Sequence, residues 1–209
     1  MNILVIGASR GIGARVVEQA LAGGHRVTAL VRDPAAMKRT DAQLDVVRGD
    51  IRDEGAVDGV MAGQDAVGLA IGCVPSCAAI SLFSTGTAHV LAAMQRHGVR
   101  KLVCVTGIGA GDSRGHGGFL YDAIIRPVLL RTMYDDKDRQ ERAIRASDRD
   151  WVIARPGFLT NGPLTGIYKV VTDLAGVRAG RVSRADVAHF MLDQMRTMSC
   201  RHLTPLITN

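Results

Sequence analysis

Short continuous apolar runs recur along the chain, and the segments between them carry apolar residues every three or four positions. The first run, residues 3–6, stops at a glycine. The next segment places five apolar residues on one face of a helix: Ile12, Val16, Val17, Ala20 and Leu21. An unbroken apolar run is typical of a strand buried on both faces, and the later spacing is that of an amphipathic helix. We therefore predict a strand, a glycine turn and a helix that ends at Gly23 and Gly24.

The same alternation continues along the chain. Further strands are predicted at residues 26–31, 44–48, 66–71, 101–105 and 151–154, with shorter ones at 167–171 and 203–207. Helices are predicted at residues 34–37, 54–61, 80–97, 119–130 and 133–147, and a last helix starts at the motif Ser183-x-x-Asp186. Without a linker or an internal repeat, this order predicts one α/β domain over residues 1–209. We expect a single Rossmann-type domain, with a doubly wound, mostly parallel sheet and helices on both faces.

Three glycines, Gly7, Gly11 and Gly13, connect the first strand to the first helix. Backbone N–H groups and the helix dipole at such a turn attract an anion, and absent side chains let a phosphate approach. The spacing G-x-x-x-G-x-G differs from the pattern G-x-G-x-x-G, and a tight structural turn is the alternative interpretation. The strand before the turn and the periodic helix after it favour dinucleotide binding.

Two arginines favour NADP(H) over NAD(H). Arg32 ends the second predicted strand about twenty positions after Gly13, where such folds bind the ribose 2′ group. An arginine pairs with a 2′-phosphate, whereas an acid accepts from a 2′-hydroxyl. Arg10 in the glycine turn adds a second cation, and Asp33 beside Arg32 leaves NAD(H) open. The alternative is that both arginines are merely exposed.

Other strand ends are expected to border the same crevice. Asp50 and Ile51 follow the third strand and are candidates to hold adenine. The alternative, that Asp50 only forms a turn, is nearly as well supported. Ile71 and Gly72 end the fourth strand, beside the point where the winding of the sheet reverses. The glycine-rich residues 106–118 are expected to form a long, mobile loop over the crevice.

The helix at 133–147 is densely charged, and its sequence predicts three ion pairs four residues apart: Asp135/Arg139, Asp138/Arg142 and Glu141/Arg145. Its inward stripe is expected to be Met133, Lys137, Gln140 and Ile144. Lys137 is the anomaly of this stripe, because lysine seldom faces inward without a partner.

Composition and charge narrow the function classes. The chain has 26 Lys and Arg against 20 Asp and Glu, but these basic residues are scattered and form no stripe with aromatics, so we expect no nucleic-acid partner. No apolar run reaches ~18 residues and no signal peptide is evident, so we expect a cytoplasmic protein without a membrane partner. His89 and His97 have no partner at metal-ligand spacing, and we expect no metal site.

Several motifs together resemble one family. Gly7-Ala-Ser-Arg-Gly-Ile-Gly13, Val31-Arg-Asp-Pro34, Arg155-Pro-Gly157 and Ser183-Arg-Ala-Asp-Val-Ala188 resemble the atypical (NmrA-like) short-chain dehydrogenase/reductases. Gly162-Pro-Leu-Thr-Gly166 and His189-Phe-Met-Leu192 are most similar to the biliverdin-IXβ reductase/flavin reductase branch. The resemblance spans essentially the whole chain. It implies that the pyrophosphate is held by Gly7, Ser9, Arg10, Gly11, Ile12 and Gly13, and the 2′-phosphate by Arg10 and Arg32. Asp50 and Ile51 would flank the adenine. The nicotinamide half would be lined by Ile71, Gly72, Thr106, Pro156, Gly157 and Phe158.

The chain departs from the family's Tyr-x-x-x-Lys pattern, in which the tyrosine donates a proton and the lysine binds the nicotinamide ribose. Lys137 fits the lysine register, but position 133 is Met and Tyr134 is one residue off. One residue turns a helix by about 100°, so the Tyr134 ring is expected to point away from the direction of position 133. Lys137, Thr106 and Tyr134 remain the candidate catalytic residues.

The missing tyrosine favours the flavin/biliverdin branch, which also lacks it. We therefore expect NADPH-dependent hydride transfer to a flat conjugated acceptor, such as a flavin, a quinone or a biliverdin-like tetrapyrrole. The substrate side is expected in residues of about 107–133 and 155–180, walled by five aromatics: Phe119, Tyr121, Tyr134, Phe158 and Tyr168. The alternative is that these aromatics bury small clusters of their own. Two rival functions are a carbonyl reductase or epimerase of a small metabolite, and a non-catalytic NAD(P)-binding redox sensor.

Overall fold

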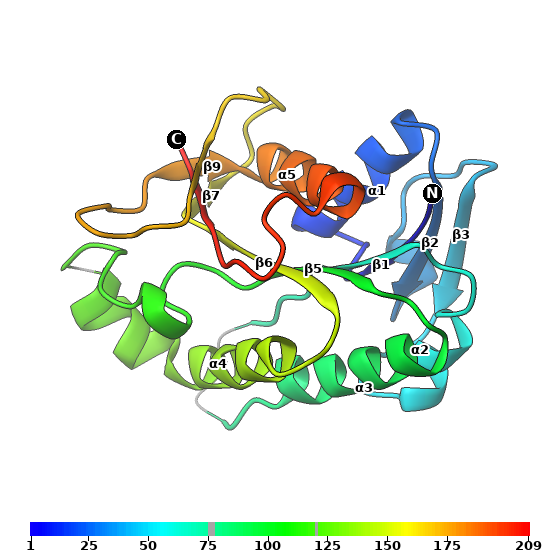
Figure 1. Cartoon of the computed structure of the whole chain (residues 1–209), viewed down its shortest axis with the longest axis horizontal. Helices are drawn as coiled ribbons and strands as arrows, with labels where there is room; N and C mark the ends of the chain where they lie inside the picture. The colour runs from blue at the N-terminus through cyan, green and yellow to red at the C-terminus, as the bar shows by residue number, and fades with distance from the viewer. Residues whose placement is uncertain (75–77, 120) are drawn as a thin grey trace.

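An eight-stranded sheet runs through the centre of the computed structural model, which describes residues 1–74, 78–119 and 121–209 (Figure 1). The strands lie in the order β3-β2-β1-β4-β5-β6-β10-β8. The bounds of these strands are β3 Leu44–Arg48, β2 Arg26–Val31, β1 Asn2–Ile6, β4 Ala66–Leu69, β5 Lys101–Val105, β6 Asp150–Pro156, β10 Leu206–Thr208 and β8 Lys169–Val171. All neighbouring pairs are parallel except β8 with β10. The order 3-2-1-4-5-6 is that of a Rossmann fold, so the predicted class of fold is confirmed.

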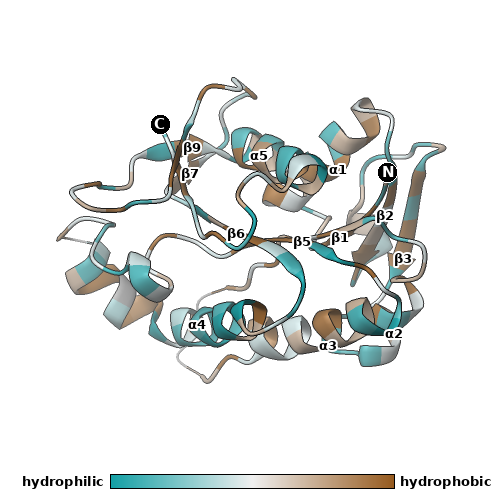
Figure 2. Ribbon diagram, in the orientation of Figure 1, coloured by the Kyte–Doolittle hydropathy of each residue, from teal (hydrophilic) through white to brown (hydrophobic). Residues whose placement is uncertain are grey.

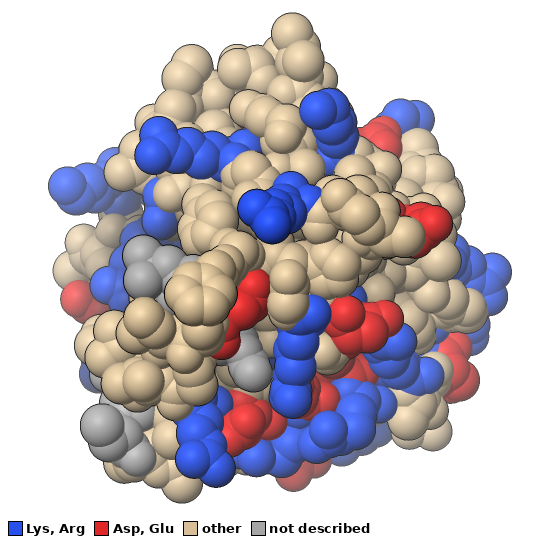
Figure 3. Space-filling view, turned by 90° about the vertical axis from the view of Figure 1, so that its left-hand side faces the viewer, with Lys and Arg blue, Asp and Glu red and all other residues tan. Residues whose placement is uncertain are grey.

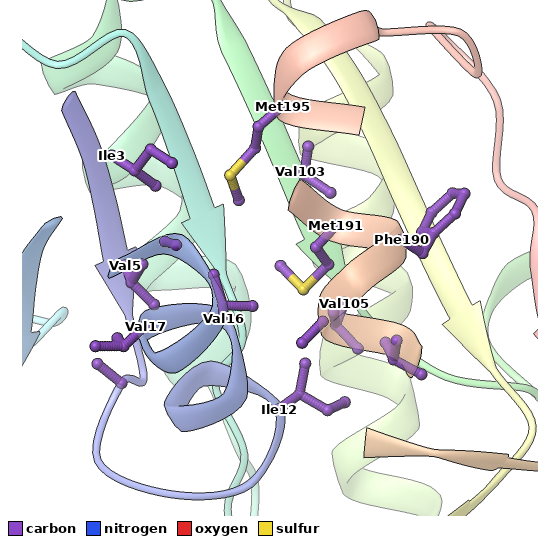
Figure 4. Close-up of a cluster of buried hydrophobic side chains, with 14 of the residues drawn as sticks. Ile3, Val5, Ile12, Val16, Val17, Val103, Val105, Phe190, Met191 and Met195 are labelled. Carbon is purple, nitrogen blue, oxygen red and sulfur yellow. The ribbon is translucent and has the colours of Figure 1, made fainter. Parts of the chain in front are cut away.

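Helices cover both faces of this sheet (Figure 1). The helices are α1 Gly11–Ala22, α2 Glu54–Gly59, α3 Leu82–Arg96, α4 Arg131–Arg145 and α5 Arg184–Thr197. On one face α1 and α5 pack together, so that Val16 and Met191 share a cluster with β1 and β5 (Figure 4). On the other face α2, α3 and α4 cover a second cluster around Leu4, Met94 and Ile153. The sheet is therefore buried on both sides, as its brown, apolar strands in Figure 2 indicate.

The apolar runs located the strands well. The bounds of β2, β3 and β5 agree with the prediction, whereas β4 ends at Leu69, two residues early. The Ser183 motif also begins a helix as predicted, because the Ser183 hydroxyl accepts a hydrogen bond from the Asp186 N–H at 2.9 Å. The apolar faces of α1 and α5 are buried as the spacing requires.

Two regions differ from the helices that were predicted. The segment η1 (Pro34–Ala36) is a single 3-10 turn. Instead of an α-helix over 119–130, the chain forms a π-helix, η3 (Tyr121–Leu129), in which Pro127 cannot donate a backbone hydrogen bond. Residue 120 of that prediction lies outside the described residues.

A second sheet was not predicted. Strands β7 (Phe158–Thr160) and β9 (Arg181–Ser183) pair in parallel beside the main sheet, with Phe158 opposite Arg181 and Thr160 opposite Ser183. Each strand has three residues, which is too short for a periodic pattern to show.

The glycine-rich segment after β5, predicted as a long loop over the crevice, is anchored to the rest of the domain by hydrogen bonds. Residues 106–110 are buried, and a 3-10 turn, η2 (Gly111–Ser113), follows them. The Gly111 N–H donates to Asp138 at 2.7 Å, and the Ser113 hydroxyl donates to the Ala110 carbonyl at 2.6 Å. These bonds fix the segment against α4, although its glycines give it no apolar periodicity.

Helix α4 buries three of its acidic residues, Asp136, Asp138 and Glu141. Of the three predicted ion pairs, the described residues show Glu141 with Arg145, at 3.7 Å, while Arg139 pairs with Asp136 and Asp138 with Arg114. Asp136 also accepts from the Phe83 N–H at 2.8 Å, at the start of α3. Asp138 thus pairs outside the helix, whereas Arg139 takes a different partner within it. In the inward stripe Lys137, Gln140 and Ile144 are buried as predicted, but Met133 is half-buried and Tyr134 is buried in addition.

Charged side chains of both signs are intermixed on the face that Figure 3 presents, at the height of α4, and the basic residues form no continuous stripe there. No helix within the described ranges combines the length and apolarity that a membrane span requires.

Candidate functional site

A cavity of about 570 Å³ opens at the carboxyl edge of the sheet, around the ends of β1 and β4 where the winding reverses. Almost every residue that the sequence assigned to the site lines this cavity: Gly7, Ser9, Arg10, Gly11, Ile12, Arg32, Asp50, Ile51, Ile71, Gly72, Thr106, Tyr134, Lys137, Pro156, Gly157 and Phe158. Gly13 is the exception and lies behind the turn. The structure therefore gathers residues from six separate strand ends and loops at one place.

The glycine turn is held by close backbone approaches. Gly7 has φ of +88° and faces the Ala70 carbonyl so closely that a side chain would overlap it. Gly13 faces the Gly7 carbonyl in the same way, which lets the first turn of α1 pack onto the loop. Gly11 has φ of +63° with open space beside it. The N-terminus of α1 thus faces the cavity without intervening side chains, as a phosphate site needs.

The charges at one end of the cavity favour an anion. Arg10 and Arg32 are exposed and line the cavity. Asp33 is not among its lining residues, because its carboxylate caps η1 by accepting from the Ala35 N–H at 3.0 Å. Asp50 forms an ion pair with Arg52 at 2.7 Å, and this partner lowers the pKa of Asp50 to about 2. The carboxylates of Asp33 and Asp50 therefore each have a hydrogen-bonded partner other than Arg32, although the charge of Arg32 also contributes to the lowered pKa of Asp50.

Lys137 lies buried at the other end of the cavity. Its ammonium donates to the Thr106 carbonyl and lies 5.1 Å from the ring centre of Phe83 and 5.9 Å from that of Tyr134. Burial lowers the pKa of Lys137, and nearby Cys104, Cys73 and Glu141 partly oppose that shift. The aromatic faces supply cation–π attraction in place of a directly bound carboxylate.

Tyr134, one residue off the family's tyrosine register, lies at the cavity. The side chain is 6% exposed, lines the cavity and shares a hydroxyl–hydroxyl hydrogen bond of 2.6 Å with Tyr121. Residues three apart on a helix are surface neighbours, and helical side chains lean toward the N-terminus. Tyr134 and Lys137 therefore both face the cavity despite the offset in the motif.

Aromatic residues form part of the wall beside this pair. Tyr121 meets Phe158 edge to face, with ring centres 5.5 Å apart, and both line the cavity with Tyr134. Phe119 and Tyr168 do not: Phe119 is 85% exposed, and Tyr168 packs on His189 and Phe190. Three of the five predicted aromatics thus lie at the site.

The sequence did not indicate all lining residues. Ile108, Leu159 and Arg184 also face the cavity, and Arg184 donates to the Asn161 side chain at 2.8 Å. Arg184 stood within the Ser183 motif, which was interpreted only as a helix start. Arg184 is the first residue of α5 and directly follows β9, a strand that was not predicted.

Sheet order, glycine turn and cavity define a Rossmann-type nucleotide-binding protein. Residues 7–197 match the NAD(P)H-binding family, so the chain belongs to that family. This confirms the dinucleotide-binding class that the glycine turn and the family resemblance predicted.

Two relatives share part of the sequence. An uncharacterized chloroplastic protein of Arabidopsis thaliana is 31% identical over 173 residues, which are 79% of this chain and 61% of that protein. The N-acetyl-alpha-D-glucosaminyl-diphospho-ditrans,octacis-undecaprenol 4-epimerase of Escherichia coli O157:H7 is 30% identical over 120 residues, 55% of this chain and 35% of the enzyme. The chain therefore spans less than two thirds of either relative.

Solved structures share the fold over the entire chain. An anaerobilin reductase of Escherichia coli O157:H7 aligns with a TM-score of 0.81 and 24% identity, covering 100% of this chain and 97% of the other. A short-chain dehydrogenase/reductase of Veillonella parvula in complex with NADP aligns with a TM-score of 0.80 and 16% identity, covering 100% and 94%. At these identities the likeness concerns the fold.

Proposed function

We propose that the protein is an NADPH-dependent oxidoreductase that transfers hydride to a flat conjugated acceptor, such as a flavin, a quinone or a biliverdin-like tetrapyrrole. One observation carries the proposal: a single cavity extends from two arginines, past the glycine turn and buried Lys137, to the aromatic wall of Tyr121 and Phe158. An anionic nucleotide suits the first end and a planar, apolar molecule the other.

The residues of the cavity divide among the parts of the cofactor. The glycine turn, with Ser9 and Ile12, would hold the pyrophosphate, and Arg10 and Arg32 the 2′-phosphate. Asp50 and Ile51 would flank adenine. The nicotinamide half would lie against Ile71, Gly72, Thr106 and residues 156–158, with the Lys137 ammonium on the ribose hydroxyls.

Bound NADPH supplies the hydride, and the acceptor gains that hydride and a proton from solvent while NADP⁺ is left. The protein's contribution is to hold donor and acceptor face to face, since proximity and orientation provide most of the rate. The substrate side, built by segments of about 107–133 and 155–180, would hold the acceptor against Tyr121, Phe158 and Leu159.

The first experiment is titration of the purified protein with NADPH and NADH, followed by NADPH oxidation with FMN, a quinone and biliverdin separately. Anaerobilin is a fourth acceptor to include, because a relative in fold is an anaerobilin reductase. Tighter binding of NADPH and turnover on flat acceptors are expected. Binding without turnover on any acceptor would favour the redox sensor, and no binding of either nucleotide would sink the proposal.

Replacing Arg32 by glutamine weakens NADPH binding about tenfold, because one charge-assisted hydrogen bond to phosphate contributes about 1.5–3 kcal/mol. NADH binding changes by less than about twofold, since the 2′-phosphate is absent. Isothermal titration of both nucleotides measures the difference. Asp33→Asn is the matched control and leaves the preference unchanged, because Asp33 caps η1. Equal losses for NADPH and NADH would contradict the assigned role.

A second candidate function, carbonyl reduction or epimerisation of a small metabolite, is favoured by the Tyr134 hydroxyl in the cavity. The epimerase among the sequence relatives supports keeping it. Tyr134→Phe separates the two functions. With a solvent proton completing the reduction of a flat acceptor, the variant keeps turnover within about threefold of wild type. A general-acid role instead requires a loss of about 10²-fold or more.

A further inference from the structure

The ammonium of Lys137 has no carboxylate partner among the ion pairs of the described residues, and its hydrogen bond goes to the Thr106 carbonyl. The position of the ammonium in the cavity therefore depends on where one peptide carbonyl points. The next residue, Gly107, has φ of +143°, a conformation that L side chains rarely adopt. Backbone hydrogen bonds flank this peptide, from the Thr106 N–H to the Ala154 carbonyl at 3.0 Å and from the Ile108 N–H to the Pro156 carbonyl at 3.1 Å. The side chain of Thr106 adds a further restraint on the side that faces α4.

The side chain of Thr106 is tied to a buried ion pair. Its hydroxyl donates to the Glu141 carboxylate at 2.7 Å, and Arg155 donates to the same carboxylate at 3.1 and 2.5 Å. Arg155 and Glu141 are 1% and 2% exposed, and Asp112 pairs with Arg155 at 2.5 Å from the far side. None of Glu141, Arg155 and Asp112 is among the cavity-lining residues.

The chain passes directly over this pair. A Cβ on Gly111 would lie 2.5 Å from the guanidinium of Arg155 and 2.8 Å from the carboxylate of Glu141. A buried ion pair gives little net stability compared with an apolar pair of similar volume. Stability therefore does not explain why this ion pair is buried beneath Gly111. A role in fixing the position of Thr106 explains it better.

We infer that Glu141 and Arg155 are positioning residues for the cofactor-binding lysine: they fix Thr106, whose carbonyl fixes the Lys137 ammonium in the cavity. The inference rests on the proposed role of Lys137 toward the nicotinamide ribose. Arg155 orients the Glu141 carboxylate, Glu141 holds the Thr106 hydroxyl, and the peptide of Thr106 then presents its oxygen to Lys137. A carboxylate that does not contact Lys137 thereby determines where that lysine lies.

The test is a double-mutant cycle on NADPH affinity with Glu141→Gln and Lys137→Met. Glu141→Gln weakens NADPH binding about tenfold in the wild-type background, about 1.4 kcal/mol. In the Lys137→Met background the Glu141→Gln substitution adds no further loss of affinity, because the ammonium that Glu141 positions is absent. The same loss in both backgrounds, or no loss in the wild type, would overturn the inference. Failure of the wild-type protein to bind NADPH would instead overturn the proposed function.

Asp138→Asn is the matched control. Asp138 is a buried acid of the same helix and also holds the 109–114 segment, through the Gly111 N–H and Arg114, but it has no bond to Thr106. It is expected to lower thermal stability and to change NADPH affinity by less than about twofold. A loss equal to that of Glu141→Gln would show that any anchor of the segment matters, and would overturn the specific role.

If Glu141→Gln does not fold, Thr106→Val and Thr106→Ser replace it in the cycle. Valine removes the hydroxyl that reaches Glu141 and leaves the carbonyl and the ion pair, whereas serine keeps the hydroxyl. Thr106→Val is expected to match the tenfold loss only when Lys137 is present, and Thr106→Ser to restore binding. If Thr106→Val weakens NADPH binding equally in the Lys137→Met background, the inference is overturned.

Discussion

Replacing Gly13 by alanine is expected to weaken NADPH binding about 100-fold or more, about 2.7 kcal/mol. A methyl group there would overlap the Gly7 carbonyl oxygen, which is backbone and cannot rotate away. Either α1 or the glycine turn must shift, and both carry the backbone N–H groups that a pyrophosphate would use. The same overlap costs about 1–3 kcal/mol of folding free energy, as overpacking does. Titration with NADPH and chemical denaturation measure the two effects.

Gly24→Ala is the control for that variant. Gly24 has φ of +72°, no neighbouring atom within 4 Å, and a place beyond the far end of α1. Alanine there costs about 1–2 kcal/mol of stability through backbone strain alone. NADPH affinity is expected to stay at the wild-type value. If Gly13→Ala also binds NADPH normally, the glycine turn is a structural connection and not the phosphate site.

Lys137→Met is expected to weaken NADPH binding about 10- to 100-fold, because hydrogen bonds from a charged donor contribute about 1.5–3 kcal/mol. Methionine fills similar volume between the rings of Phe83 and Tyr134. In the wild type, affinity is expected to fall as pH rises through the lowered pKa of Lys137, where the ammonium loses its proton. The variant has no such pH dependence. Affinities measured across the alkaline range test both statements.

The stability of the folded protein should respond in the opposite direction. Because burial lowers the pKa of Lys137, the unfolded chain holds the proton more strongly than the folded one. The free energy of unfolding therefore gains a contribution as pH rises between the folded-state and unfolded-state pKa values. At neutral pH the buried ammonium is a cost, so Lys137→Met is expected to be more stable than wild type. A variant that is less stable and binds NADPH normally would assign Lys137 a structural role only.

The parts of the fold that sequence predicted well are those set by burial alone. Continuous apolar runs located β2 and β5 within the sheet, because a central parallel strand needs apolar residues on both faces. The glycine turn was equally evident, since only glycine fits beside the Gly7 and Ala70 carbonyls. These features depend on local sequence and on a generic core.

The parts that were missed depend on partners far along the chain. Periodicity showed that Lys137 faces inward, but not that the Thr106 carbonyl, 31 residues away, would receive it. The acids of α4 looked like half of a solvent-exposed charge pattern, yet Asp136 and Glu141 bond to segments that the fold brings to them. Arg155 appeared only as part of a family motif, and it lies buried against Glu141 without lining the cavity. A charge pattern in the sequence does not distinguish an acid that forms a surface ion pair from a buried carboxylate that accepts hydrogen bonds.

The small parallel sheet of β7 and β9 has a consequence for how this cavity can change over evolutionary time. The ladder joins residues 158–160 to 181–183, on either side of an excursion that returns to the cavity at Arg184. Within the excursion, β8 is fastened to β10, leaving residues 161–168 and 172–180 as two connections with fixed ends. The entropy of closing such connections grows only slowly with length. Neither connection lines the cavity itself, but the first continues directly from β7, whose Phe158 and Leu159 do. Insertions there would therefore extend the surface beside these two residues and leave the glycine turn intact.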